Sequence, residues 1–268
     1  MILNLAGGAG AGGKSELVYA GNHTVVVYNG TDGLAYKLYT IMGSGTLTAK
    51  NVKSADIWMC GGGSNGIKAG GGGAGAYATT LMAQELSGTY AVVIGTGNGG
   101  VTSLGEIATA NGVAGSMNGG TGGGAFGGYS AVGAGDGVSK YPFGDSTFFK
   151  CHCAGGGGGG YSWREENGMS SSKRGGGTGG TNGGNGKNDG AYASPTPEDT
   201  TASGGEGGNY GGGKGGYGAW RDSSASGGSA ATFYGSGGGG GGNGQHYSDN
   251  EKDGGAGYQG VMYIRIPA

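Results

Sequence analysis

Residues 55–63 read ADIWMCGGG, and this stretch decides the fold because an apolar segment runs directly into a run of glycines. Its first six residues are apolar apart from Asp56, which is typical of a mostly buried β-strand. Working outward, other short segments are rich in β-branched and aromatic residues: 23–29, 34–41, 45–49, 77–81, 89–94, 105–110 and 260–267. The sequence therefore predicts about eight strands and no helix.

The last predicted strand, residues 260–267, alternates in character, so that Met262, Ile264 and Ile266 share one face. A lone strand would expose its backbone donors and acceptors, so this segment must pair with the N-terminal strands across a long glycine-rich insert. We therefore expect an all-β fold in which residues 1–117 and 258–268 form one antiparallel β-sandwich or jelly roll. The sizeable apolar core then combines the two ends of the chain.

Residues 118–257 form the second predicted domain, and their character is set by glycine. The chain contains 78 glycines in 268 residues, which only collagen-like, low-complexity or specially packed proteins reach. Collagen is excluded, since it needs glycine at every third position and abundant proline, whereas this chain has 4 prolines. Disorder is the main alternative, but the glycine runs alternate with segments containing Tyr and Trp that a flexible linker would lack.

Glycine runs can be ordered if they adopt the polyproline-II conformation, with three residues per turn and no internal hydrogen bonds. Their N–H and C=O groups then point outward, and neighbouring runs without side chains can approach closely enough to bond laterally. We expect such a bundle of glycine helices over residues 118–257, with loops at its ends.

Composition excludes several classes of function. The formal net charge is −2, with 15 basic and 17 acidic residues, which disfavours binding to nucleic acid or to an anionic membrane. No apolar run reaches the ~18 residues of a membrane span, and residues 1–7 do not resemble a signal peptide. Three cysteines do not suggest a secreted disulfide framework. We expect assembly in a cytoplasm, and no cofactor.

Two motifs resemble a phosphate-binding loop and a zinc site, but the residues around them do not support either function. Residues 8–15 (GAGAGGKS) have the spacing of a phosphate-binding loop, but no strand precedes them and no helix follows. Cys151, His152 and Cys153, together with Cys60, could supply zinc ligands. On a strand over residues 148–154, however, His152 would point away from the two cysteines, so we favour small cysteines packed at a junction with the glycine region.

Glycoside hydrolysis would need two carboxylates about 5–9.5 Å apart in a cleft. Acidic residues occur in the polar segments of the glycine-rich domain: Glu165, Glu166, Glu198, Asp199, Asp249, Glu251 and Asp253. Nothing in the sequence positions them, and no nucleophile-elbow motif is present. We therefore expect no enzymatic activity.

Aromatic residues between the glycine runs are the candidate binding residues. Tyr, Trp and Arg are enriched at binding hot spots, and flat aromatic faces suit both sugar rings and peptides. The candidate receptor-binding residues are Tyr161, Trp163, Arg164, Tyr192, Tyr217, Trp220, Arg221 and Tyr247. The alternative role for such aromatics, including Tyr210, Phe233 and Tyr234, is to cap the ends of the bundle.

Several stretches resemble the glycine-rich domain of prophage tail-fibre proteins from Gram-positive bacteria. The stretches are residues 1–8 (MILNLAGG), 40–49 (TIMGSGTLTA), 55–63, 70–76 and the closing 260–266 (GVMYIRI). The arrangement is also similar to the TNF-like sandwich with polyglycine helices in anaplastic lymphoma kinase and leukocyte tyrosine kinase. Glycine helices also form the tail-fibre tip adhesins of T-even-like phages, although this chain, unlike those, has strands for its own sandwich.

The resemblance implies a phage tail-fibre or tail-tip adhesin, located in the virion and binding a host cell-surface glycan or protein through loops between glycine helices. It also implies contacts with other tail or virion proteins and a homotrimer, with neither nucleic-acid binding nor membrane insertion. The alternative is a purely structural virion protein, such as a fibre segment or head decoration, that binds no receptor.

Overall fold

The computed structural model describes about three fifths of the chain. The described residues are 15–68, 72–73, 75–112, 142–145, 152–157, 159, 161–164, 171–174, 201–202, 211–216, 218–219, 226–244 and 252–268. Within this set, strands dominate, and the helical element is the short 3₁₀ turn η2 at Pro142–Gly144. The all-β prediction is therefore confirmed for the described residues.

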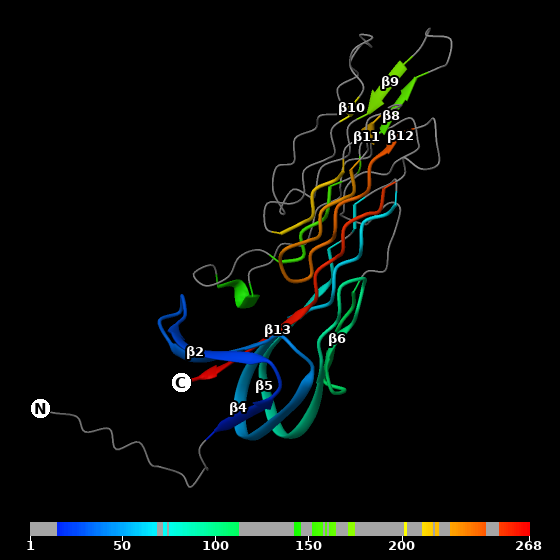
Figure 1. The fold of residues 1–268 in the computed structure, drawn as a ribbon. Helices are drawn as coiled ribbons and strands as arrows, with labels where there is room; N and C mark the ends of the chain where they lie inside the picture. The colour runs from blue at the N-terminus through cyan, green and yellow to red at the C-terminus, as the bar shows by residue number, and fades with distance from the viewer. Residues whose placement is uncertain are drawn as a thin grey trace, which may run out of the picture.

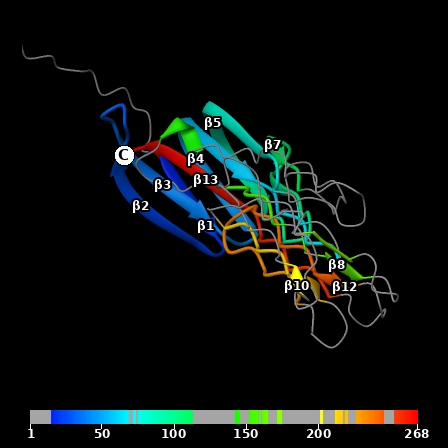
Figure 2. The same cartoon turned by 90° about the horizontal axis from the view of Figure 1, so that it is seen from above.

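An eight-stranded antiparallel sheet forms one end of the molecule (Figure 1). Its strands are β1 (Glu16–Ala20), β2 (His23–Asn29), β3 (Ala35–Ile41), β4 (Gly45–Cys60), β5 (Ala78–Val93), β6 (Thr102–Leu104), β7 (Ala108–Ala110) and β13 (Val261–Pro267). Their order is β2-β3-β13-β4-β5-β6-β7, with β1 added beside the first half of β4. Figure 2 shows β2, β3, β13 and β4 side by side from above.

The last strand pairs across the insert, as the sequence predicted. β13 lies between β3 and β4, with Ile264 opposite Tyr39 on one side and Ile57 on the other. Because successive side chains of a strand alternate, Met262, Ile264 and Ile266 enter one buried cluster while Val261 and Tyr263 enter another. Both faces of β13 are therefore covered.

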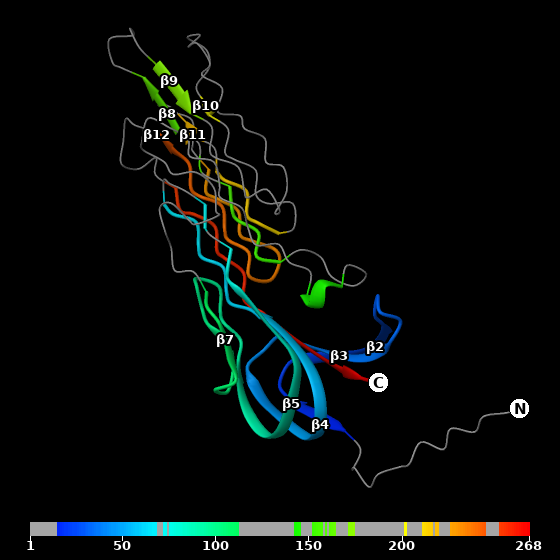
Figure 3. The ribbon, with the colours of Figure 1, turned by 180° about the vertical axis from the view of Figure 1, so that it is seen from behind.

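β4 and β5 pair along their length and form a curved ribbon (Figure 3). Both strands contribute side chains to the larger buried cluster, which includes Leu47, Ile57 and Leu86. Register shifts interrupt their pairing between Ala49 and Ile57, and Asn51 and Ala83 take positive φ angles of 52°. Such bulges increase the local twist and bend a strand. β1 therefore pairs with one half of β4 and β13 with the other, and both contribute to the core around Leu47 and Ile57.

Several strand predictions need correction. Segments 45–49 and 55–60 belong to one strand, β4, and segments 77–81 and 89–94 belong to β5. The polar residues between each pair of segments also pair, with β-bulges at the register shifts, so each strand is continuous. Segment 105–110 is a turn followed by β7, since Gly105 has a φ of 48° that interrupts a strand. β1 and β6 of this sheet were not predicted, nor were the five short strands of the glycine-rich region, so the described residues form thirteen strands rather than about eight.

The glycine-rich segments run away from the sheet toward a second group of short strands (Figure 1). These are β8 (Tyr161–Arg164), β9 (Ser171–Arg174), β10 (Thr201–Ala202), β11 (Gly218–Ala219) and β12 (Asn243–Gly244). Residues 235–242, which we call the central run, are buried throughout. The central run links the sheet end of the molecule to β12.

Backbone hydrogen bonds of the central run follow a period of three. Consecutive N–H groups donate to three different segments, and each segment receives a bond from every third residue, at N···O distances of 2.8–3.0 Å. The pairs are Gly237 to Ala154, Gly240 to Gly157, Gly238 to Ser64, Gly241 to Ile67, Gly239 to Ser229 and Gly242 to Ser226. Its carbonyls accept from three further segments, at residues 73, 213–216 and 252–255. The central run is therefore held by lateral backbone bonds rather than by apolar side chains.

Candidate functional site

β8 lies at the end of the glycine-rich region that is remote from the eight-stranded sheet (Figure 1). It pairs antiparallel with β9 and parallel with β12, so it forms the middle of a three-stranded sheet. The register places Tyr161 opposite Arg174 and Trp163 opposite Ser172. Three of the predicted receptor-binding residues, Tyr161, Trp163 and Arg164, therefore belong to one strand at this end.

The other predicted receptor-binding residues lie outside the described residues: Tyr192, Tyr217, Trp220, Arg221 and Tyr247. β11 nevertheless occupies Gly218–Ala219, between Tyr217 and Trp220, and β12 ends three residues before Tyr247. Of the acidic residues considered for glycoside hydrolysis, Asp253 is described and exposed. The proposed roles of these aromatic and acidic residues stay predictions.

An aromatic cluster surrounds His152 where the sheet meets the glycine-rich region. The imidazole is fully buried, and its Nε2 lies 2.9 Å from the hydroxyl oxygen of Tyr263. The ring centroids of Trp58 and Phe233 lie 4.8 and 4.9 Å from that of His152. Tyr234 stacks on the same imidazole with an interplanar angle of 14°. Phe233 and Tyr234 therefore pack at the base of the glycine-rich region, as the capping alternative requires.

The prediction that residues 148–154 form a strand is wrong for the described residues 152–154, and Cys151 lies outside them. Cys153 has a φ of 62°, and its N–H donates to the carbonyl of Tyr234 at 3.1 Å instead of joining a ladder. The positive φ turns the chain at Cys153, and the side chains of both His152 and Cys153 are buried. Cys153 packs near Cys60, which confirms the predicted cysteine junction for this pair.

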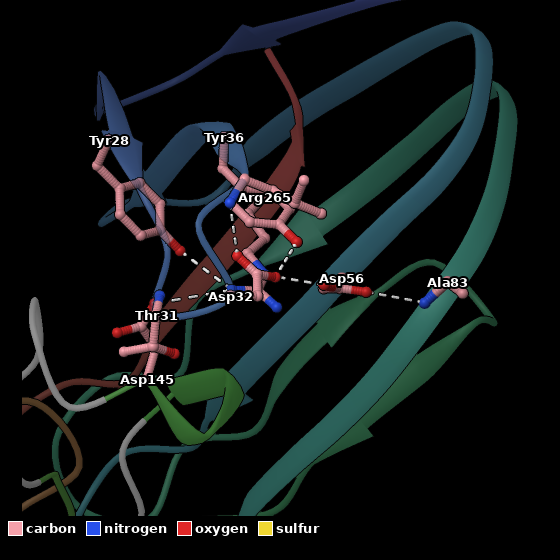
Figure 4. Close-up of polar contacts among 9 residues, drawn as sticks. Tyr28, Thr31, Asp32, Tyr36, Asp56, Ala83, Asp145 and Arg265 are labelled. Atoms are coloured by element: carbon pink, nitrogen blue, oxygen red, sulfur yellow. Dashed lines mark hydrogen bonds and ion pairs between the residues drawn. The ribbon is translucent and has the colours of Figure 1, made fainter.

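Arg265 of β13 is the centre of a buried polar cluster on the same face of the sheet (Figure 4). Its Nε donates to Asp56 Oδ2 at 2.8 Å, and its Nη1 donates to the Tyr28 hydroxyl at 3.2 Å. Nη1 also lies 3.9 Å from Oδ2 of Asp145 in the segment after η2. We call Arg265, Asp56 and Asp145 the Arg265 cluster.

The cluster joins parts of the chain that are distant in sequence. Asp56 accepts a bond from the Ala83 N–H of β5, and Asp145 accepts one from the Thr31 N–H in the β2–β3 turn (Figure 4). The guanidinium stacks over the rings of Tyr36 and Phe143 at 4.3 and 4.7 Å. Burial would lower the pKa of Arg265, but hydrogen bonds to Tyr28 and Asp56 offset this and raise it. The arrangement holds residues 142–145 against the sheet.

Alkaline pH is expected to destabilise the protein through Tyr263. Burial, followed by the nearby Cys60, raises the pKa of its phenol well above the ordinary value. The unfolded chain releases this proton near pH 10 while the folded protein keeps it, so the free energy of unfolding falls by about 1.4 kcal/mol per pH unit above that point. Burial acts in the same direction on Tyr39.

This pH dependence can be measured by urea unfolding between about pH 8 and pH 11. Tyr263→Phe is expected to remove about 1.4 kcal/mol per pH unit from the alkaline slope, although it loses the contact with His152. Tyr77→Phe, at a phenol that is 62% exposed, serves as the control for removing a hydroxyl. An identical slope in the wild type and in Tyr263→Phe would contradict the expectation.

Among the described residues, no three His, Cys, Asp or Glu side chains are grouped in a way that could hold a metal ion. Within the same part of the chain, no helix is long and apolar enough to cross a membrane.

Comparisons of the chain with models of protein families, with curated proteins and with solved structures found no match.

Proposed function

We propose that the protein is a non-catalytic adhesin of a phage tail fibre or tail tip, which binds a host cell-surface glycan or protein. The observation that carries this proposal is the position of β8 at the end of the glycine-rich region remote from the eight-stranded sheet (Figure 1). Tyr161, Trp163 and Arg164 belong to that strand. A receptor can approach such an end while the sheet end attaches to the rest of the virion.

The fold proposed for this adhesin is a TNF-like β-sandwich interrupted by polyproline-II-type glycine helices. Support for the helices comes from the period of three in the hydrogen bonds of the central run, since polyproline II has three residues per turn. Support for the sandwich comes from the larger buried cluster around Leu47 and Ile57. β1 and β13 pair with opposite halves of the bent strand β4, and both contribute residues to this cluster. Lateral bonding makes the glycine region a stiff support.

Tryptophan variants test the proposal directly. Trp163→Ala and Trp220→Ala are each expected to weaken attachment of the fluorescently labelled protein to host cells by about tenfold or more, because truncating a hot-spot aromatic costs roughly 2 kcal/mol. Attachment is measured by flow cytometry over a titration of the protein on a strain that the wild type binds. Thermal unfolding of each variant shows that folding is retained.

The matched control is Tyr77→Ala, which removes an exposed aromatic immediately before β5 and away from β8. This variant should attach like the wild type. Full attachment by both tryptophan variants, or equal losses in all three variants, would contradict receptor binding through the segments between glycine runs.

The alternative function is a structural virion part, and the edge strand β2 favours it. Val25, Val26 and Val27 are 42%, 42% and 65% exposed on a strand with one unpaired edge among the described residues. An exposed apolar edge strand can pair with another chain, and the proposed homotrimer would supply two further copies of this edge strand.

Val26→Lys is expected to leave a monomer in sedimentation experiments. A trimer that persists in this variant would exclude β2 from the subunit contact.

A further inference from the structure

Cys60 and Cys153 lie together where the sheet ends and the glycine-rich region begins. Cys60 is the last residue of β4, and Cys153 precedes the segment that bonds to the central run. Both are free thiols in the structure, and their exposed fractions are 0% and 1%. The thiols share a hydrogen bond, which together with burial raises the pKa of Cys153.

Gly235 shows how close the two sulfurs come to one backbone position. A Cβ built on Gly235 would lie 2.8 Å from the Sγ of Cys153 and 3.0 Å from the Sγ of Cys60. Any side chain at this position would therefore collide with both sulfurs. The φ of Gly235 is 69°, a value that glycine adopts without strain. The chain thus brings a glycine, rather than a bulky residue, against the thiol pair.

We propose that Cys60 and Cys153 form a disulfide when the protein meets a low-molecular-weight disulfide such as oxidised glutathione, and that this bond ties the sheet to the glycine-rich region. A disulfide needs an S–S distance of about 2.05 Å. Both sulfurs lie within 3.0 Å of one point, the Cβ position of Gly235, so they occupy the same small space at this junction. Formation of this bond depends on the contact between the two cysteines and not on receptor binding.

The reaction is two successive thiol–disulfide exchanges. The thiolate of one cysteine attacks a sulfur of oxidised glutathione, which forms a mixed disulfide and releases one glutathione thiolate. The second cysteine then attacks the protein sulfur of the mixed disulfide and releases the other. Two cysteine sulfurs lose two electrons in all, glutathione disulfide gains them, and the two cysteine protons end on the two glutathione thiols.

Burial determines when the exchange occurs. Since both sulfurs are shielded and a protonated thiol does not attack, the folded protein should react slowly. Oxidation should be faster while the chain folds, before the central run covers the pair. The same shielding protects the finished disulfide from reductants. The bond would close a loop of roughly 90 residues, and loops of that length gain much of their stability from restricting the unfolded chain.

The test uses the full chain carrying Cys151→Ser, which leaves one possible intramolecular pair. One sample is refolded from denaturant in a glutathione redox buffer, and another is incubated in the folded state with oxidised glutathione. Peptide mapping by mass spectrometry without reduction identifies the linked residues, and titration counts free thiols. We expect the Cys60–Cys153 peptide pair in the refolded sample, with slower formation in the folded sample. Its Tm should exceed that of the reduced protein by about 5–10 °C.

Three results would overturn the proposal: mixed glutathione adducts in both samples, disulfides only between chains, or a Tm that does not rise on oxidation. Cys60→Ala in the Cys151→Ser background retains one thiol and should show no oxidation-dependent rise in Tm. If Cys151→Ser fails to fold, peptide mapping of the oxidised wild type distinguishes Cys60–Cys153 from pairings that involve Cys151.

Discussion

Gly239→Ala is expected to lower the free energy of unfolding by about 3 kcal/mol or more, because the central run has no space for a methyl group. A Cβ at Gly239 would lie far inside van der Waals contact with the carbonyl oxygen of Lys214. The obstacle is backbone, which cannot rotate away as a flexible side chain can. The central run or the 211–216 segment must therefore move.

Movement of the central run breaks bonds in several directions at once. Gly239 donates to the carbonyl of Ser229 at 2.9 Å and accepts from the N–H of Gly255 at 2.7 Å. The next residues along the run bond to other segments, so a shift that relieves one overlap displaces donors on the remaining sides. Buried backbone groups without partners each cost about 1–3 kcal/mol. The expected loss therefore exceeds that of an ordinary Gly→Ala replacement.

Gly227→Ala is the matched control within the same region. Its Cβ would meet only the carbonyl oxygen of Asp253, at 3.1 Å, and the position has no positive φ. A small adjustment accommodates it, and alanine also restricts the unfolded chain, so the change should stay within about 1 kcal/mol. Guanidinium unfolding followed by tryptophan fluorescence measures both variants. Equal stabilities of the two variants would show that close backbone packing does not limit the central run.

The strands predicted best from the sequence are those whose own residues have high β-strand propensity. Strand β2 matches its predicted bounds, because the run of Val and Thr ends at the turn-forming pair Asn29-Gly30. The alternation along β13 also placed its residues on the correct faces. In the long strands β4 and β5, the polar middles carry no strand signal of their own. Their continuity depends on pairing with each other across bulges at Asn51 and Ala83, which a single sequence does not reveal.

The candidate sites likewise include residues that the sequence could indicate and contacts that it could not. Tyr161, Trp163 and Arg164 could be selected by composition, but β9, which pairs with β8, is the sequence SSKR and has no strand propensity. The partners of Arg265 could not be predicted at all. Asp145 is far from Arg265 in sequence and lies in the insert, and no spacing rule relates two residues that meet only after the insert folds back.

Arg265→Met is expected to destabilise the protein by about 3–5 kcal/mol at neutral pH, because it removes the cation from between two buried carboxylates. The side chains of Arg265, Asp56 and Asp145 are 8%, 13% and 2% exposed, so water does not replace the lost guanidinium. Methionine keeps the length of the side chain, and the loss is therefore electrostatic rather than a cavity. Lys53→Met is the control, since Lys53 and Glu85 are 78% and 73% exposed at 3.8 Å, and such pairs contribute less than about 1 kcal/mol.

The pH dependence of Arg265→Met separates charge from packing. Without the guanidinium, the negative charges of Asp56 and Asp145 are buried without compensation, and this cost disappears when the carboxylates are protonated. The variant should therefore regain stability relative to the wild type on acidification. Arg265→Met combined with Asp145→Asn should recover part of the loss at neutral pH, because the amide keeps the shape of the carboxylate without its charge. If the double variant is no more stable than the single one and acid restores nothing, then Arg265 holds residues 142–145 by stacking on Tyr36 and Phe143 rather than by charge.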